Sequence, residues 1–88
     1  MNSNKPVQEF RYGYVRATVW LNQTSSGVMY NVTVSRSYKD KTTDEWGDSS
    51  SFGDLDLPAL AKAVNDAHTW IYQQKASARV SSVDGEAA

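Results

Sequence analysis

The sequence predicts an α+β fold: an antiparallel β-meander of three or four strands, followed by one carboxy-terminal helix packed on one face of the sheet. Between Phe10 and Phe52, β-branched and aromatic residues alternate with polar ones, which is typical of half-buried strands. After Gly53 the apolar residues recur at steps of three and four, which indicates an amphipathic helix. A chain of 88 residues has the size of a single domain.

The strands are expected at three places, separated by polar loops that suit hairpins. The first covers Phe10 to Asn22, and Gly13 can split off Phe10 to Tyr12 as a short strand of its own. The second runs from Val28 to Tyr38, and the third from Trp46 to Phe52 after a charged turn.

The helix is expected to begin after Asp56, which suits the N-cap position, and to end near Gln73. Leu55 and Leu60 have the spacing of a hydrophobic staple. The expected apolar stripe comprises Leu57, Leu60, Ala61, Val64, His68 and Ile71. We expect this stripe to cover the purely apolar sheet face formed by Val15, Ala17, Val19 and Leu21.

Composition divides the chain into a flexible arm (residues 1–8), one domain (9–74) and a disordered tail (75–88), because both ends lack apolar periodicity. The chain has no cysteine, which excludes disulfides and thiolate metal sites. It also has no apolar leader and no apolar run of about 20 residues, the length that crosses a bilayer. We therefore expect a cytoplasmic protein without a membrane partner.

The second face of the sheet carries the candidate site. If Val15, Ala17 and Val19 face the core, the alternate residues form a mixed aromatic, basic and hydroxyl face: Tyr12, Tyr14, Arg16, Thr18 and Trp20, then Met29, Asn31, Thr33, Ser35 and Ser37. Aromatic rings stack on unpaired bases, and arginine and hydroxyl groups bind phosphate and sugar oxygens. This pattern predicts a surface that binds single-stranded nucleic acid.

The charge distribution supports the same interpretation. Through Thr42 the chain has six basic and two acidic residues, a net charge of +4, and the remainder has three basic and eight acidic residues, a net charge of −5. Binding of a polyanion depends on the local field of a surface rather than on the total charge of −1. Arg36, Lys39 and Lys41 are expected to add positive charge at the edge of the site.

The segments GVMYNVTVSRSYKD and SFGDLDLPALAKAV, with a tryptophan strand between them, resemble single-strand-binding domains of the positive-cofactor-four and Whirly type. The resemblance covers roughly Phe10 to Gln73. It implies two protomers that pair through their helices and sheets, and sheets that offer grooves for single-stranded DNA. The blocks at residues 29–33, 35–40 and 67–71 are also similar to small bacterial proteins.

The same residues allow other interpretations. The aromatic face can instead be a protein-interaction or assembly surface, because exposed apolar patches mark interfaces of any kind. Arg36, Lys39 and Lys41 can simply protect a strand edge. Ala63, Ala67 and Trp70 lie beside the expected apolar stripe of the helix and are predicted to form the interface of a homodimer.

Catalysis is not expected, and neither is a metal or another cofactor. His68 is the sole histidine and lies on the expected apolar stripe. The acids between Asp44 and Asp56 do not follow the spacing of a calcium loop, and Ser49 to Ser51 lack the glycines of a nucleophile elbow. The sequence therefore predicts a non-catalytic binding module.

Overall fold

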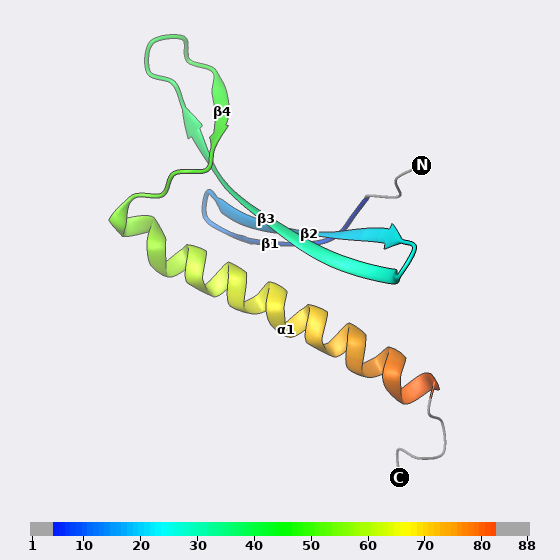
Figure 1. Cartoon of the computed structure of the whole chain (residues 1–88). Coiled ribbons are helices and arrows are strands. Elements are labelled where there is room, and N and C mark those ends of the chain that lie inside the picture. Colours follow the sequence, from blue (N-terminus) through cyan, green and yellow to red (C-terminus); the bar gives the residue numbers. More distant parts are fainter. Residues whose placement is uncertain (1–4, 83–88) are drawn as a thin grey trace.

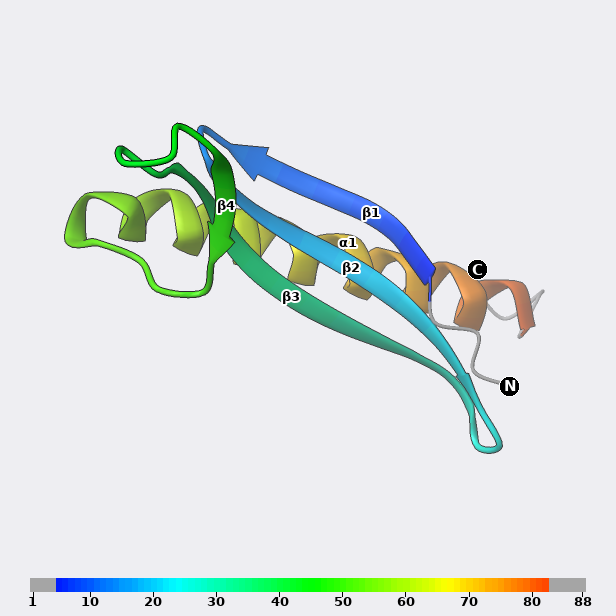
Figure 2. The ribbon, with the colours of Figure 1, turned by 90° about the horizontal axis from the view of Figure 1, so that it is seen from above.

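The computed structural model describes residues 5–82, which form a four-stranded antiparallel sheet and one long helix (Figure 1). The strands are β1 (Lys5–Tyr12), β2 (Val15–Thr24), β3 (Gly27–Lys39) and β4 (Trp46–Ser49), in the sheet order β1-β2-β3-β4. A 3₁₀ turn, Asp54–Asp56, leads into α1 (Leu57–Ser82), which crosses one face of the sheet (Figure 2). The predicted α+β meander with one helix is confirmed.

Two glycines make the hairpins. Gly13 has φ 63° and Gly27 has φ 124°, backbone conformations that residues with a Cβ rarely adopt. Tyr12 pairs with Val15 across the first turn, and Thr24 pairs with Gly27 across the second. Both loops are therefore two residues long, and the separate strand before Gly13 is confirmed.

The first strand is longer than predicted and the last is shorter. β1 begins at Lys5, so the flexible arm expected for residues 1–8 is wrong over 5–8, and residues 1–4 lie outside the described part. A register shift between Pro6 and Gln8 accommodates the proline at the edge of the sheet. β4 ends at Ser49 rather than at Phe52.

The core is a thin layer between β2 and α1. Val15, Ala17 and Val19 are buried as predicted, and their partners from the helix are Ala63 and Ala67. The two alanines let the helix backbone approach the strand closely. Larger side chains surround them and are half-buried: Val7, Phe10, Tyr30, Val34, Trp70 and Ile71.

The helix is rotated relative to the predicted stripe. Leu57, Ala61, Val64 and His68 are exposed, whereas Ala63, Ala67 and Trp70 face the sheet. The Trp70 ring meets the Tyr30 ring edge to face with 5.8 Å between centroids. The predicted dimer interface of Ala63, Ala67 and Trp70 is therefore wrong, because these residues pack on the chain's own sheet.

The helix begins at Leu57, directly after Asp56 as predicted, but its capping contacts and its end differ from expectation. The Asp56 carboxylate accepts a hydrogen bond from the Gly53 backbone N–H at 3.1 Å, and Leu55 is 90% exposed, so Leu55 forms no hydrophobic staple. The helix continues past Gln73 to Ser82, which replaces the predicted disordered tail over 75–82. Residues 83–88 lie outside the described part. None of the described helices is long and apolar enough to cross a membrane.

Candidate binding surface on the open face of the sheet

The sheet face opposite α1 is the candidate site, and we call it the open face. Residues that are directly paired across strands share a face, as do alternate residues along one strand. The cross-strand pairs therefore assign the following residues to this face: Glu9 and Arg11 of β1; Arg16, Thr18 and Trp20 of β2; Asn31, Thr33, Ser35, Ser37 and Lys39 of β3; and Trp46 and Asp48 of β4. The open face is a polar strip, and the aromatic side chains of Tyr14 and Trp46 lie at the end nearest β4.

Most of the predicted site residues lie on the open face. Arg16, Thr18 and Trp20 project from β2, and Tyr14 lies in the turn before it, next to Trp46 of β4. The five residues expected from the second strand are on the same face: Met29, Asn31, Thr33, Ser35 and Ser37. The alternation in the sequence was sufficient to group them.

Tyr12 is on the other face, contrary to the prediction. It pairs with Val15 across the Gly13 turn, so it shares the face that the helix covers. Its hydroxyl donates a hydrogen bond to the Asp66 carboxylate of α1. This hydrogen bond, followed by desolvation and the negative charge of Asp66, raises the pKa of Tyr12 above its usual value.

Arg36 is also on the helix-covered face, because it pairs with Val15. Its Nε donates a hydrogen bond to the Ser51 carbonyl at 3.1 Å and lies 3.4 Å from the Asp56 carboxylate. The guanidinium also lies 6.0 Å from the centre of the Tyr38 ring. Arg36 therefore holds the segment between Ser51 and Asp56, which leads into α1, against the sheet. It adds no charge to the open face.

The two lysines are at the β3–β4 hairpin, away from the centre of the open face, although Lys39 pairs with Trp46 and so lies on this face at its β4 end. Lys39 forms an ion pair with Asp44 at 3.1 Å, and Lys41 lies exposed in the turn. Asp44 has φ 65°, and its N–H donates to the Asp40 carbonyl. The Asp40 side chain in turn accepts hydrogen bonds from the backbone N–H groups of Thr42 and Thr43. The acids therefore shape this turn and offset its positive charge.

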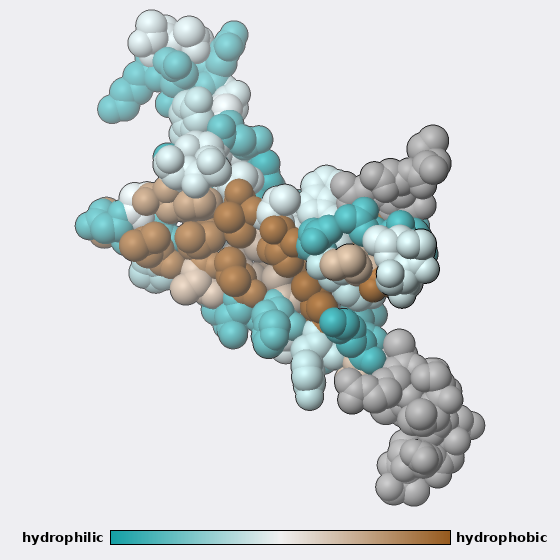
Figure 3. All heavy atoms as spheres, viewed as in Figure 1, coloured by the Kyte–Doolittle hydropathy of each residue, from teal (hydrophilic) through white to brown (hydrophobic). Residues whose placement is uncertain are grey.

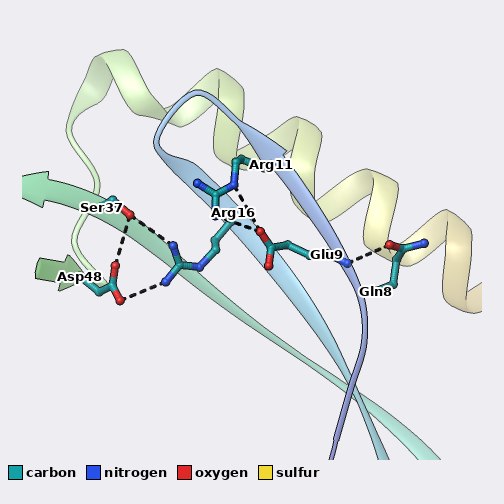
Figure 4. Close-up of polar contacts among 6 residues, drawn as sticks. All are labelled: Gln8, Glu9, Arg11, Arg16, Ser37 and Asp48. Carbon is teal, nitrogen blue, oxygen red and sulfur yellow. Dashed lines mark hydrogen bonds and ion pairs between the residues drawn. The ribbon is translucent and has the colours of Figure 1, made fainter. Parts of the chain in front are cut away.

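Arg16, at the centre of the open face, is held in a three-residue network (Figure 4). Its guanidinium donates to Ser37 Oγ at 3.2 Å and to the Asp48 carboxylate at 3.0 Å. The Ser37 hydroxyl donates to the other Asp48 oxygen at 3.3 Å. Asp48 is not among the site residues that the sequence predicted, because only the β3–β4 register brings it beside Ser37.

The second arginine of the face is paired as well. Arg11 Nη2 lies 3.1 Å from the Glu9 carboxylate, two residues earlier on β1 (Figure 4). The cations of β1 and β2 on the open face thus each contact an acid of the same face. The expected positive surface is locally neutral, which the sum of charges along the chain does not reveal.

Aromatic rings supply the apolar part of the open face. The rings of Tyr14 and Trp46 lie 5.6 Å apart at a tilt of 35°, and these residues are 62% and 58% exposed. Trp20 is half-buried, and its Nε1–H donates to Thr33 Oγ1 at 2.8 Å. Tyr14 and Trp46 therefore form the accessible aromatic pair, whereas Trp20 is held against the strand.

Comparison with known proteins finds no significant match to a protein-family model, a curated protein or a solved structure. Within residues 5–82, no group of three or more histidines, cysteines or acids is arranged to hold a metal ion. The fold and site define a small α+β domain with one covered and one open sheet face.

Proposed function

We propose that the chain is a non-catalytic protein-interaction module that binds a protein partner through the open face. The observation that supports this most is the ion pair between Arg16 and Asp48. A phosphate would have to compete with Asp48 for the guanidinium. A protein surface can instead cover an arginine that is already paired, because no unpaired charge is then left buried.

The aromatic pair supports the same function. Exposed tyrosine and tryptophan side chains are common anchors of protein interfaces, since they bury a large apolar area with few rotatable bonds. Tyr14 and Trp46 stand at one end of the open face, beside serine and threonine hydroxyls that can bond to a partner's backbone. The matching partner presents an apolar side chain to the aromatic pair and amide groups to the hydroxyl strip.

Single-stranded nucleic acid is the second candidate, favoured by the same aromatic pair, because exposed rings are stacking platforms for bases. The ion pair between Arg16 and Asp48 offers a way to distinguish the two functions by experiment. Asp48 is exposed, and Asp48→Asn leaves the half-buried Arg16 without its counter-ion.

The test is a titration of tryptophan fluorescence with a mixed single-stranded oligonucleotide at low and moderate salt. We expect no saturable quenching for the parent, and weak salt-sensitive quenching for Asp48→Asn, because the freed arginine attracts phosphate. Saturable, salt-sensitive quenching of the parent would overturn the protein-interaction proposal in favour of nucleic acid.

A photo-crosslinking amino acid at Asn31, which is exposed on the open face opposite Trp20, identifies the partner class in cells. The same group at Thr69, on an exposed part of α1 away from the β3 side, is the matched control. We expect a protease-sensitive adduct specific to the Asn31 position, which is lost in the Tyr14→Ser, Trp46→Ser double variant. A nuclease-sensitive adduct would contradict the proposal.

A further inference from the structure

One edge of β3 is unpaired over most of its length. β4 pairs with β3 only from Arg36 to Lys39, so within the described residues the segment Gly27–Ser35 has a neighbour on the β2 side alone. Figure 2 shows β3 as the outermost strand along this stretch. A free edge presents unpaired backbone N–H and C=O groups to another strand.

The two long edges of the sheet are built differently. The β1 edge carries a lysine, a proline and a register shift at its start, features that discourage pairing with another strand. The β3 edge from Gly27 to Ser35 has no charged residue and no proline, and three of its residues are valines. This edge is open to pairing with a strand of another chain.

Apolar side chains lie beside the free edge on the helix-covered face. Val28 and Val32 of β3 are exposed, and they are on this face because they pair with Gln23 and Val19 of β2. Their exposure follows from the position of the helix, which packs mainly on β1 and β2 and less on β3. One helix is too narrow to cover the β3 side of the sheet.

The near side of the helix is apolar too. Tyr12 of β1 bonds to Asp66, so that flank of α1 faces β1. Because an α-helix turns by about 100° per residue, Leu57 and Val64 lie on the opposite flank, toward β3. Both are exposed. Figure 3 shows the hydrophobic surface as a band between the sheet and the helix.

We propose that a second copy of this chain covers this surface, which we call the β3-edge surface: the free edge of β3 with Val28, Val32, Leu57 and Val64. The two β3 strands pair antiparallel about a two-fold axis, which joins the two sheets into one. The two helices then lie on the same face of the joined sheet, and their near flanks meet over the exposed valines. This proposal concerns the opposite face from the protein-interaction proposal and does not depend on it.

Symmetry identifies the partner as a second copy. Antiparallel pairing of one strand with itself is self-complementary and closed, so it produces a dimer and no filament. The same rotation that pairs the edges also brings the two apolar helix flanks together. An extended peptide of another protein would pair with the edge but would leave Leu57 and Val64 uncovered.

The small core gives a physical reason for this dimer. Within residues 5–77, the buried hydrophobic residues are only five, all valine or alanine: Val15, Ala17, Val19, Ala63 and Ala67. Domains of this size bury a smaller fraction of their surface than larger ones and have little stability to spare. Burial of the β3-edge surface of two chains adds to this core.

Sedimentation equilibrium tests the proposal directly. At tens of micromolar the parent is expected at twice its chain mass of 9.8 kDa. Val64→Lys and Val32→Lys each place a charge in the dimer interface, and we expect dissociation constants raised by about tenfold or more. Both parent side chains are exposed in the single chain, at 43% and 38%, so neither substitution removes a buried group.

Two control variants carry the same added charge elsewhere. Thr69→Lys is on an exposed part of α1 away from the β3 side, and Met29→Lys is on β3 but on the open face. Both are expected to remain dimeric. A monomeric parent, or Val64→Lys and Val32→Lys variants that dimerise like the parent, would overturn the proposal.

Hydrogen exchange of the parent tests the edge without any substitution. If β3 pairs with β3, amide protection within Val28–Val34 falls on dilution below the dissociation constant, whereas protection in the β1–β2 hairpin changes less. Protection that is the same at high and low concentration would also overturn the proposal.

Discussion

The two faces of the sheet differ in what they contribute. On the covered face, Val15, Ala17 and Val19 are buried against two alanines of α1, with no polar side chain fully buried among the described residues. On the open face, Arg16, Ser37 and Asp48 bond to one another while partly exposed. Burial on one face therefore stabilises the fold, while the other face keeps a polar surface whose hydrogen bonds are satisfied and which is free to bind a partner.

The largest expected effect comes from a charge on the covered face. Ala67→Asp buries a carboxylate with no partner at a residue that is 1% exposed, and we expect a loss of about 3 kcal/mol or more, enough to unfold the domain. Circular dichroism with urea denaturation measures it. Thr69→Asp, on an exposed part of the same helix away from the β3 side, is the control and is expected to change stability by less than about 0.5 kcal/mol. Equal losses would mean that α1 does not pack as described.

A substitution on the open face is expected to cost much less. Thr33→Val keeps the shape of the side chain but removes the acceptor of the Trp20 Nε1–H bond. Because Trp20 remains partly exposed and water can replace the acceptor, we expect a loss of about 0.5 to 1 kcal/mol, measured by urea denaturation. A loss as large as that of Ala67→Asp would show that the open face, too, carries the stability of the fold.

The smallest effect is a pH dependence where the helix meets β1. The raised pKa of Tyr12 means that the folded state holds the phenolic proton more tightly than the unfolded state does. Its contribution to stability is therefore complete below the unfolded pKa and is lost as pH rises through the folded pKa. Unfolding at alkaline pH measures this, with Tyr12→Phe as the variant expected to lose the dependence. An unchanged dependence in Tyr12→Phe would contradict the assignment to the Tyr12 bond with Asp66.

Much of the fold followed from local patterns. The period of two along β2 and β3 correctly separated the core valines from the open face, because alternation in a strand is a property of the backbone. The same alternation could have placed Arg36 correctly, since it continues the series of Val32 and Val34. The prediction for Arg36 depended on its charge and its position near a hairpin, and neither of these determines which face of the sheet a side chain is on.

Other features depended on contacts that no local pattern contains. Tyr12 changes face because the chain reverses at Gly13, so the continuous strand assumed across that turn gave it the wrong side. The rotation of α1 also escaped prediction. Alanines carry little hydrophobic signal, yet their small size makes the Ala63 and Ala67 side the one that packs closest on the sheet.

By itself, the sequence determined the type and order of the elements, the helix after the meander and the residues of the core strand, because these depend on periods and turns encoded within a few neighbouring residues. Only the tertiary structure decided which side of the helix is buried, and that Arg16 is paired with Asp48. Those outcomes depend on packing and on strand register between residues far apart in the chain. They also decide the charge of the open face, on which the proposed function depends.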